Sequence, residues 1–294
     1  MEYVEPIYRP PSERNSLLLQ VALGCSWPKC TFCASYLINF IKPFKIRAID
    51  DIKRDIDLSK TIYNARSIRR VFLLDSNALA IKTDTLLEIL NYITKSYPRI
   101  ERISTYGTIK DIQRKSDSDL IKLKEAGLKM VYVGIESGDD IVLKEVNKGV
   151  NASEIISESK KLINNGIELS ATIILGLGGQ ENSYNHIMNT ANVINKINPH
   201  YLGALTLMVV PNTPLHQKIV KKEFVPLNPI QMIQELRLLV DNLTDLNNCV
   251  FRSNHASNYL AVKGILSKDR LLMLKTIDNC IKTQNLRPEY LRGL

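Results

Sequence analysis

The strongest constraint on the fold is an alternation of short apolar segments with amphipathic ones. Six segments are short, apolar and often β-branched, as buried parallel strands are. They span residues 17–24, 70–75, 102–106, 130–136, 169–176 and 201–209. Five predicted helices lie between them, at residues 50–63, 83–96, 116–126, 151–165 and 182–195. Repeated strand–helix units of this kind form a parallel sheet, and six of them predict an α/β fold, a partial (β/α)6 barrel of the TIM type.

Glycine and proline positions agree with this division of the chain. Gly127 and Gly166 lie where two predicted helices should end, directly before the next strand. The run Pro211-Asn212-Thr213-Pro214 predicts a turn after the last strand, and two further helices are predicted near residues 228–242 and 267–283. We therefore expect an N-terminal extension (1–16), a barrel (17–210) and a C-terminal helical extension (211–294) that closes the barrel mouth.

Three of the five cysteines, Cys25, Cys30 and Cys33, lie within nine residues of sequence. They follow the first predicted strand, and the chemistry of βα barrels gathers at the C-terminal ends of strands. Thiolates at this spacing suit an iron–sulfur cluster or zinc. A set of only three leaves the metal an open position, whereas a structural zinc would need a remote fourth ligand. Candidates for that ligand are Cys249, Cys280 and His255.

Composition limits the partners and the compartment. The net charge is +9, but the basic residues are scattered over predicted helices, which favours solvated helix faces over a nucleic-acid surface. No apolar run is as long as a membrane span, and the N-terminus lacks a signal pattern. We expect a cytoplasmic protein without membrane association, with nucleic acid disfavoured as a partner. An odd cysteine count in that compartment favours metal binding over disulfides.

Polar residues and glycines also mark the ends of later strands. Asp75-Ser76-Asn77 follows the second strand, Gly134-Ile135-Glu136-Ser137-Gly138 ends the fourth, and Gly176-Leu177-Gly178-Gly179 follows the fifth. Packing explains a charged glutamate at the end of an apolar strand poorly. A carboxylate between two glycines can instead approach a ligand closely and accept hydrogen bonds from its hydroxyl groups.

In this order, the cysteine motif and the strand ends resemble the radical S-adenosylmethionine (SAM) superfamily over residues 17–210. The spacing here is Cys-x4-Cys-x2-Cys, whereas the family usually has Cys-x3-Cys-x2-Cys. The barrel is most similar to the branch with coproporphyrinogen-oxidase-like, methylthiotransferase-like and elongator-like members. The resemblance implies that Cys25, Cys30 and Cys33 hold a 4Fe–4S cluster whose fourth iron binds SAM. An electron from a donor such as ferredoxin or flavodoxin then yields methionine and a 5′-deoxyadenosyl radical, which abstracts hydrogen from the substrate.

The resemblance also implies roles for individual residues. The expected SAM contacts are Phe32 near the adenine, Asp75 or Asn77 at the methionine ammonium, Glu136 and Ser137 at the ribose and methionyl groups, and Gly176 and residues 207–210 at the adenine. The expected substrate contacts are Tyr106, at the end of the third strand, and a polar tract between the last two helices with Arg252, Asn254, His255 and Asn258. Arg252 could bind a substrate carboxylate or phosphate.

Four functions stay open from the sequence. The leading hypothesis is a radical SAM enzyme acting on an unidentified substrate. Sulfur insertion in the manner of lipoyl synthase would need a partner protein, because Cys249 and Cys280 alone cannot readily hold a second 4Fe–4S cluster. Modification of tRNA is a further alternative, although no appended RNA-binding module is visible. The non-enzyme alternative is a zinc- or cluster-binding regulatory protein.

Overall fold

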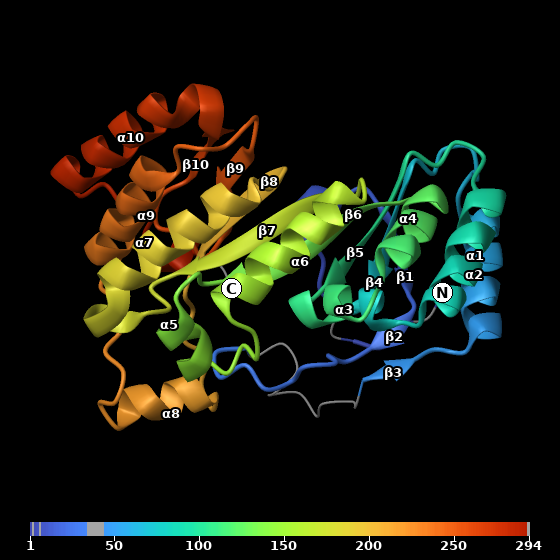
Figure 1. Cartoon of the computed structure of the whole chain (residues 1–294), viewed down its shortest axis with the longest axis horizontal. Coiled ribbons are helices and arrows are strands. Elements are labelled where there is room, and N and C mark those ends of the chain that lie inside the picture. The colour runs from blue at the N-terminus through green and yellow to red at the C-terminus, as the bar shows by residue number, and fades with distance from the viewer. Residues whose placement is uncertain (2, 6, 34–43, 293–294) are drawn as a thin grey trace. The chain divides into compact units, whose positions relative to one another are not determined.

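A computed structural model describes residues 1, 3–5, 7–33 and 44–292 of the chain (Figure 1). The chain divides into two compact units, each built from separate stretches of sequence. The first unit comprises Met1–Pro28, Ser35–Val133 and Lys161–Leu169. The second unit comprises Lys29–Ala34, Gly134–Lys160 and Ser170–Leu294.

The first unit contains parallel strands that pair in the order β1-β4-β5-β6. These strands are β1 (Leu17–Gln20), β4 (Arg70–Leu74), β5 (Arg102–Gly107) and β6 (Leu128–Glu136), the last of which continues into the second unit. A short antiparallel pair is formed by β2 (Ala22–Leu23) and β3 (Lys45–Ile46). The helices are α1 (Ile49–Ile62), α2 (Thr83–Ser96), α3 (Ile109–Gln113) and α4 (Asp117–Glu125). Helices α1 and α2 pack side by side (Figure 1).

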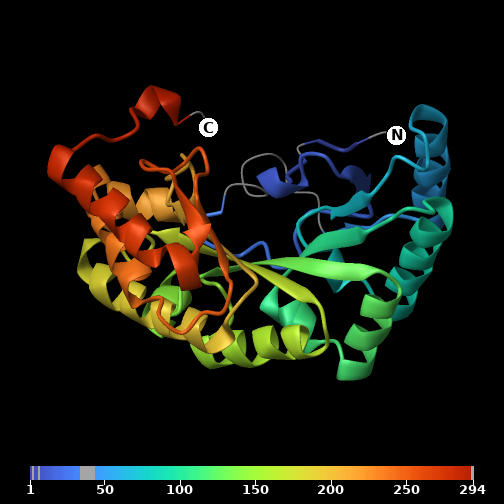
Figure 2. The same cartoon turned by 90° about the horizontal axis from the view of Figure 1, so that it is seen from above.

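The second unit continues the alternation of strand and helix. Strands β7 (Glu168–Leu175), β8 (Tyr201–Thr206) and β9 (Val250–Ser253) are parallel, and β10 (Val262–Ile265) is antiparallel to β9. The helices are α5 (Asp140–Glu145), α6 (Ala152–Asn164), α7 (Gly179–Ile197), α8 (Pro214–Val220), α9 (Pro229–Asn242) and α10 (Leu266–Thr283). The last four residues of α6 and the first two of β7 belong to the first unit. Helix α9 packs against both α7 and α10 (Figure 2). None of the described helices is long and apolar enough to cross a membrane.

The predicted alternation is confirmed, with two corrections. The segment predicted as one strand over residues 17–24 leaves the parallel sheet after Gln20, and β2 pairs with β3 instead. The C-terminal region, predicted to be helical, also contributes β9 and β10. Each of these has only four residues, and β9 pairs with β8, about fifty residues earlier. Gly127 and Gly166 follow α4 and α6 at φ values of +109° and +79°, as expected for helix-ending glycines. The domain boundaries at residues 16 and 210 stay predictions.

A buried carboxylate fixes the N-terminal segment to the strands of the first unit. Glu13, in the 3-10 helix η1 (Pro11–Glu13), is fully buried. It accepts hydrogen bonds from Arg102 Nη2 (2.7 Å), Ser104 Oγ (2.9 Å) and Tyr132 Oη (2.7 Å). Ser16 also donates to this carboxylate. The donors from β5 and β6 make Glu13 the link between the N-terminus and two neighbouring strands.

Replacing Glu13 should therefore destabilise the fold strongly. Glu13→Ala leaves Arg102, whose side chain is 17% exposed, without its partner. Removing one member of a buried pair costs about 3–5 kcal/mol, and urea unfolding measures this loss. The control is Asp278→Ala, which removes an exposed pair with Arg237 and should change the free energy of unfolding by less than about 1 kcal/mol. Equal small losses in both variants would contradict the role assigned to Glu13.

Candidate functional site

The loop that carries Cys25 is fixed to neighbouring parts of the first unit. Ser76 Oγ, just beyond the end of β4, donates to the carbonyl oxygen of Gly24 (2.6 Å). The amide of Trp27 donates to Cys25 Sγ (3.3 Å). Lys110 Nζ, on α3, lies 3.4 Å from the centroid of the Trp27 ring, a cation–π contact. The backbone on both sides of Cys25 is therefore held in place.

Asn77 is part of the same support. Its side chain is fully buried. Its Oδ1 accepts from the amide of Ser26 (3.2 Å), and its Nδ2 donates to Ser26 Oγ and to Asp111 Oδ2 (2.9 Å). Both polar atoms of the Asn77 amide are thus engaged within the protein, and they position the loop that carries Cys25.

Asp75, two residues earlier, differs from Asn77 because one of its oxygens has no partner. Its Oδ2 accepts from Gln20 Nε2 (3.2 Å), whereas its buried Oδ1 has no hydrogen-bond partner among the described residues. Burial raises the pKa of Asp75 to about 6, against the lowering effect of the Gln20 hydrogen bond. A buried oxygen without a donor is costly, so Asp75 Oδ1 is suited to a cationic N–H group of a ligand.

Cys30 and Cys33 lie in the second unit, in a short stretch held by its backbone. The amide of Thr31 donates to the carbonyl oxygen of Val146 (3.0 Å), and the carbonyl oxygen of Thr31 accepts from the amide of Leu215 (3.0 Å). The amide of Cys33 donates to the carbonyl oxygen of Cys30 (3.3 Å). Phe32, between them, is partly exposed. The stretch is thus held in place by main-chain hydrogen bonds.

Exposure separates the five cysteines, all of which are described, into two classes. Cys25, Cys30 and Cys33 are partly exposed, whereas Cys249 and Cys280 are buried. Burial raises the pKa of Cys249 to about 12 and also raises that of Cys280, which opposes the thiolate form that binds metal. Among the described residues, no three His, Cys, Asp or Glu side chains, those of the motif included, are grouped as a metal site. The accessible thiol donors are therefore those of the sequence motif, a set that suits a cluster by its chemistry.

Glu136 forms an ion pair that the sequence did not predict. It ends β6 with φ of +67°, and its Oε1 lies 2.9 Å from Lys148 Nζ. A Cβ on Gly134 would lie 2.0 Å from Glu136 Oε1, so only glycine leaves room for this carboxylate. Burial lowers the pKa of Lys148, but the charges of Glu136, Cys30 and Cys33 outweigh it and raise the pKa overall. Lys148 therefore holds a positive charge close to Glu136 and to the two cysteines.

The hydroxyl group of Ser137 forms hydrogen bonds within the protein. It is fully buried, and its Oγ lies 2.8 Å from His186 Nδ1. His186 Nε2 lies 3.0 Å from the carbonyl oxygen of Ile174. Because a carbonyl only accepts, Nε2 carries the hydrogen and Nδ1 accepts from Ser137. Burial lowers the pKa of His186 to about 4, so the ring stays neutral and ties the turn after β6 to β7 and α7.

The glycine turn after β7 is held by a glutamate of α9. Gly176 has φ of +82°, and its amide donates to Glu235 Oε2 (2.6 Å). Ser183 Oγ donates to Glu235 Oε1 (2.6 Å). A Cβ on Gly176 would lie 2.4 Å from Met232 Cε. The sequence does not single out Glu235, because this residue occurs in an amphipathic helix without a recognisable motif.

Tyr106, predicted to contact substrate, belongs to an aromatic cluster of the first unit. Its ring centroid lies 5.0 Å from that of Phe72 and 6.0 Å from that of Tyr132, and both pairs are edge to face. Tyr106 is partly exposed, whereas Phe72 is fully buried. The cluster leaves Tyr106 as the ring of the three most accessible to a ligand.

The polar tract of the second unit, residues 252–258, contains both buried and exposed side chains. Asn258 is buried, and its Nδ2 donates to the carbonyl oxygen of Ala204 (3.0 Å) and to Ser253 Oγ (2.9 Å). His255 Nδ1 lies 2.9 Å from Ser257 Oγ. Arg252 and Asn254 are exposed, and Arg252 donates to the carbonyl oxygen of the preceding residue (2.8 Å). Asn258 thus ties the tract to β8, while Arg252, Asn254 and His255 are exposed or partly exposed.

Comparisons with known proteins agree with the predicted family. The model of the Radical SAM superfamily matches residues 19–191. The chain is 24% identical over 197 residues to the heme chaperone HemW of Buchnera aphidicola, covering 65% of this chain and 50% of that protein. It is 26% identical over 262 residues to an uncharacterized protein of Methanocaldococcus jannaschii, covering 86% of this chain and 75% of that one. The chain thus spans half the length of HemW.

Solved structures confirm the predicted fold. Methylornithine synthase (PylB) superposes with a TM-score of 0.54 at 15% identity, covering 94% of this chain and 83% of that one. Coproporphyrinogen III oxidase (HemN) of Escherichia coli superposes with a TM-score of 0.58 at 15% identity, covering 78% and 52%. The architecture is therefore the partial barrel of radical SAM proteins.

The buried carboxyl of Glu235 should make stability depend on pH. Its burial raises the pKa from 4.5 to about 7, so the folded state binds more protons than the unfolded state between these values. The associated stability is complete below pH 4.5 and is lost as pH rises through 7, by about 3 kcal/mol in total. Glu235→Gln retains a carbonyl for Gly176 and an amide for Ser183 but cannot titrate. Urea unfolding from pH 4.5 to 8 should show this loss in the wild type alone, whereas parallel pH curves would contradict the assignment.

Proposed function

Since the chain belongs to the radical SAM superfamily, we propose that Cys25, Cys30 and Cys33 hold a 4Fe–4S cluster and that the protein cleaves SAM reductively. The observation that carries this proposal is the three-cysteine motif, whose thiols are accessible while the other two are buried. When bound, the cluster supplies the electron that breaks the sulfonium carbon–sulfur bond and an iron that lacks a protein thiolate. Hydrogen abstraction from an unidentified substrate, a ferredoxin- or flavodoxin-like donor and a cytoplasmic location are parts of the same proposal.

Asp75 is our candidate for binding the ammonium group of SAM. Its unpaired Oδ1 supports this role, because a buried acceptor gains most from a charged donor. An ammonium group there would favour the ionised carboxylate against the effect of burial. Asn77 would act indirectly, without contacting SAM, by holding the loop that carries Cys25.

Glu136 and Lys148 would act as a pair. Lys148 fixes Glu136 Oε1, which leaves Oε2 able to accept from the ribose hydroxyls. The positive charge of Lys148 would also offset the negative charge of the thiolates at Cys30 and Cys33, since opposite charges at short range favour the ionised form. The backbone at Gly176, held by Glu235, would meet the adenine.

Heme transfer is a second candidate, because one relative is named a heme chaperone and the alignment covers 65% of this chain. The two proposals differ in what the purified protein does. Anaerobic reduction of the cluster-loaded chain with SAM should yield 5′-deoxyadenosine if our first proposal is right. Stoichiometric heme binding without 5′-deoxyadenosine would favour the heme chaperone.

Substitution of one motif cysteine tests the cluster site. Cys30→Ala should abolish retention of iron after anaerobic reconstitution with iron and sulfide, because each of the three thiolates is needed. Cys280→Ala, which removes a buried thiol, should retain iron like the wild type. Iron content, visible absorbance and 5′-deoxyadenosine formation are measured for each chain. Wild-type 5′-deoxyadenosine formation by Cys30→Ala would refute the ligand assignment.

Substitution of Glu136 tests the proposed SAM contact. Glu136→Gln retains the length of the side chain but removes its charge, so SAM binding should weaken by about 1–3 kcal/mol. Calorimetric titration of the reconstituted chain measures the affinity, and iron content should not change. The exposed Glu145 on α5 offers the control Glu145→Gln, with unaltered binding. Equal SAM affinity in both variants would show that Glu136 does not contact SAM.

A further inference from the structure

The last two strands of the second unit place two cationic side chains directly opposite each other. Strands β9 and β10 are antiparallel, and Arg252 of β9 is paired in register with Lys263 of β10 (Figure 1). Residues opposite each other in an antiparallel pair point to the same face of the sheet, with their Cβ atoms about 5 Å apart. Like charges in this arrangement repel each other and destabilise the sheet. The packing of the sheet therefore does not explain this pair.

Neither cation has an acidic partner among the described residues. Arg252 donates to the carbonyl oxygen of Phe251 (2.8 Å), and Lys263 forms no hydrogen bond or ion pair within the described part of the chain. Both side chains are exposed. Strands β8, β9 and β10 contain no Asp or Glu, and neither does β7 from residue 170 onward. Two neighbouring positive charges without a counter-charge are suited to binding an anion.

The same level of the sheet also offers a hydroxyl group beside an open space. Gly203 of β8 is paired with Arg252 on one side and with Thr172 of β7 on the other. A Cβ on Gly203 would lie 3.8 Å from Thr172 Oγ1, so glycine leaves open the space that a side chain would fill. Thr172 and Gly203 are partly exposed, whereas their neighbours Ala171 and Leu202 are buried. The row therefore lies on the accessible face and combines a hydroxyl donor with two cations.

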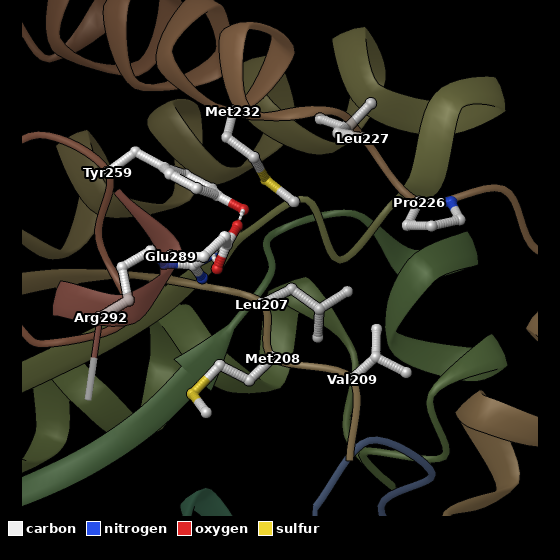
Figure 3. Close-up of a pocket in the computed structure, with 9 residues that line it drawn as sticks. All are labelled: Leu207, Met208, Val209, Pro226, Leu227, Met232, Tyr259, Glu289 and Arg292. Carbon is white, nitrogen blue, oxygen red and sulfur yellow. Dashed lines mark hydrogen bonds and ion pairs between the residues drawn. The ribbon is translucent and has the colours of Figure 1, made fainter. Parts of the chain in front are cut away.

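This row lies apart from the residues that we assign to the adenine of SAM. Figure 3 shows Leu207, Met208 and Val209 at a hollow beyond the end of β8. A Cβ on Gly176 would lie 3.7 Å from Leu207 Cβ, so this hollow belongs to the SAM side of the site. Gly203 lies four residues before Leu207, which is about 13 Å at the rise of a β-strand. An anion bound at the row would thus share β8 with the SAM site without occupying the adenine position.

We propose that Arg252 and Lys263 bind an anionic oxygen group of the substrate, a carboxylate or a phosphate. The proposal rests on the function proposed above and assigns its substrate to the anionic class. Guanidinium and ammonium groups both donate to such oxygens, and charge-assisted hydrogen bonds are about twice as strong as neutral ones. A bound anion would also offset the repulsion between the two cations. Thr172 Oγ1 would add a neutral donor on the far side of Gly203.

Three dansyl probes test the proposal on the reconstituted chain by fluorescence titration. Dansylglycine carries a carboxylate, dansyl-phosphoethanolamine carries a phosphate, and dansylglycinamide is neutral. The wild type should bind at least one anionic probe about tenfold or more tightly than the neutral one, and the comparison of the two anionic probes distinguishes carboxylate from phosphate. Arg252→Gln/Lys263→Gln should lose this preference. Lys268→Gln/Lys275→Gln removes two exposed lysines of α10 and should keep the preference at the same net charge.

Urea unfolding separates binding from a structural role. Because the double variant at Arg252 and Lys263 removes a repulsion, its unfolding midpoint should equal or exceed that of the wild type. A lower midpoint would make the pair structural and overturn the proposal.

Three binding results would also overturn the proposal. The wild type would show no preference for an anionic probe, or both double variants would lose the preference equally, which would assign it to net charge. Displacement of the bound anionic probe by SAM would assign the two cations to the carboxylate of the cofactor. Failure of the proposed function looks different, because absence of SAM binding by the reconstituted wild type would leave the probe measurements as predicted.

Discussion

Where a parallel strand ends, its backbone leaves the sheet and its polar groups need new partners. In the second unit, Glu235 supplies one by accepting from the amide of Gly176, and His186 supplies another by donating from Nε2 to the carbonyl oxygen of Ile174. In the first unit, Ser76 donates to the carbonyl oxygen of Gly24 in the cysteine loop. The candidate site therefore depends on side chains that hold strand ends in place before any ligand is bound.

Two buried carboxyl groups show how such a support differs from a ligand contact. Burial raises the pKa of both, to about 6 for Asp75 and about 7 for Glu235. Both oxygens of Glu235 accept hydrogen bonds from Gly176 and Ser183, so its bonding is complete within the protein. Asp75 leaves Oδ1 without a partner among the described residues. The incomplete bonding, rather than the pKa, makes Asp75 the better candidate for a ligand.

The sequence predicts what is local and misses what depends on distant contacts. Short apolar segments that alternate with amphipathic ones predicted the strands and helices of both units, and the cysteine motif together with the order of the strand ends predicted the family. The sequence did not predict strands β9 and β10, because each is four residues long and β9 pairs with a strand far away in sequence. The roles of Lys148 and Glu235 were not predicted for a related reason. Their partners, Glu136 and Gly176, become their neighbours only in the folded chain. Asn77 was predicted as a candidate SAM contact, whereas in the structure its side-chain amide forms hydrogen bonds with Ser26 and Asp111.

Residues inside and outside the match to the superfamily both contribute to the candidate site. The cysteine motif and the candidate SAM residues up to Gly176 lie within the match to the superfamily, whereas helix α9 lies beyond it. Helix α9 nevertheless shapes the candidate site, because Glu235 holds the glycine turn and Met232, one turn earlier, fills the space that a Cβ on Gly176 would need. A ligand that moves Met232 would thus act on the same helix that shapes the turn at Gly176. A contact that shifts α9 and a ligand bound at the glycine turn are therefore expected to influence each other, since two ligands that bias one element are thermodynamically coupled.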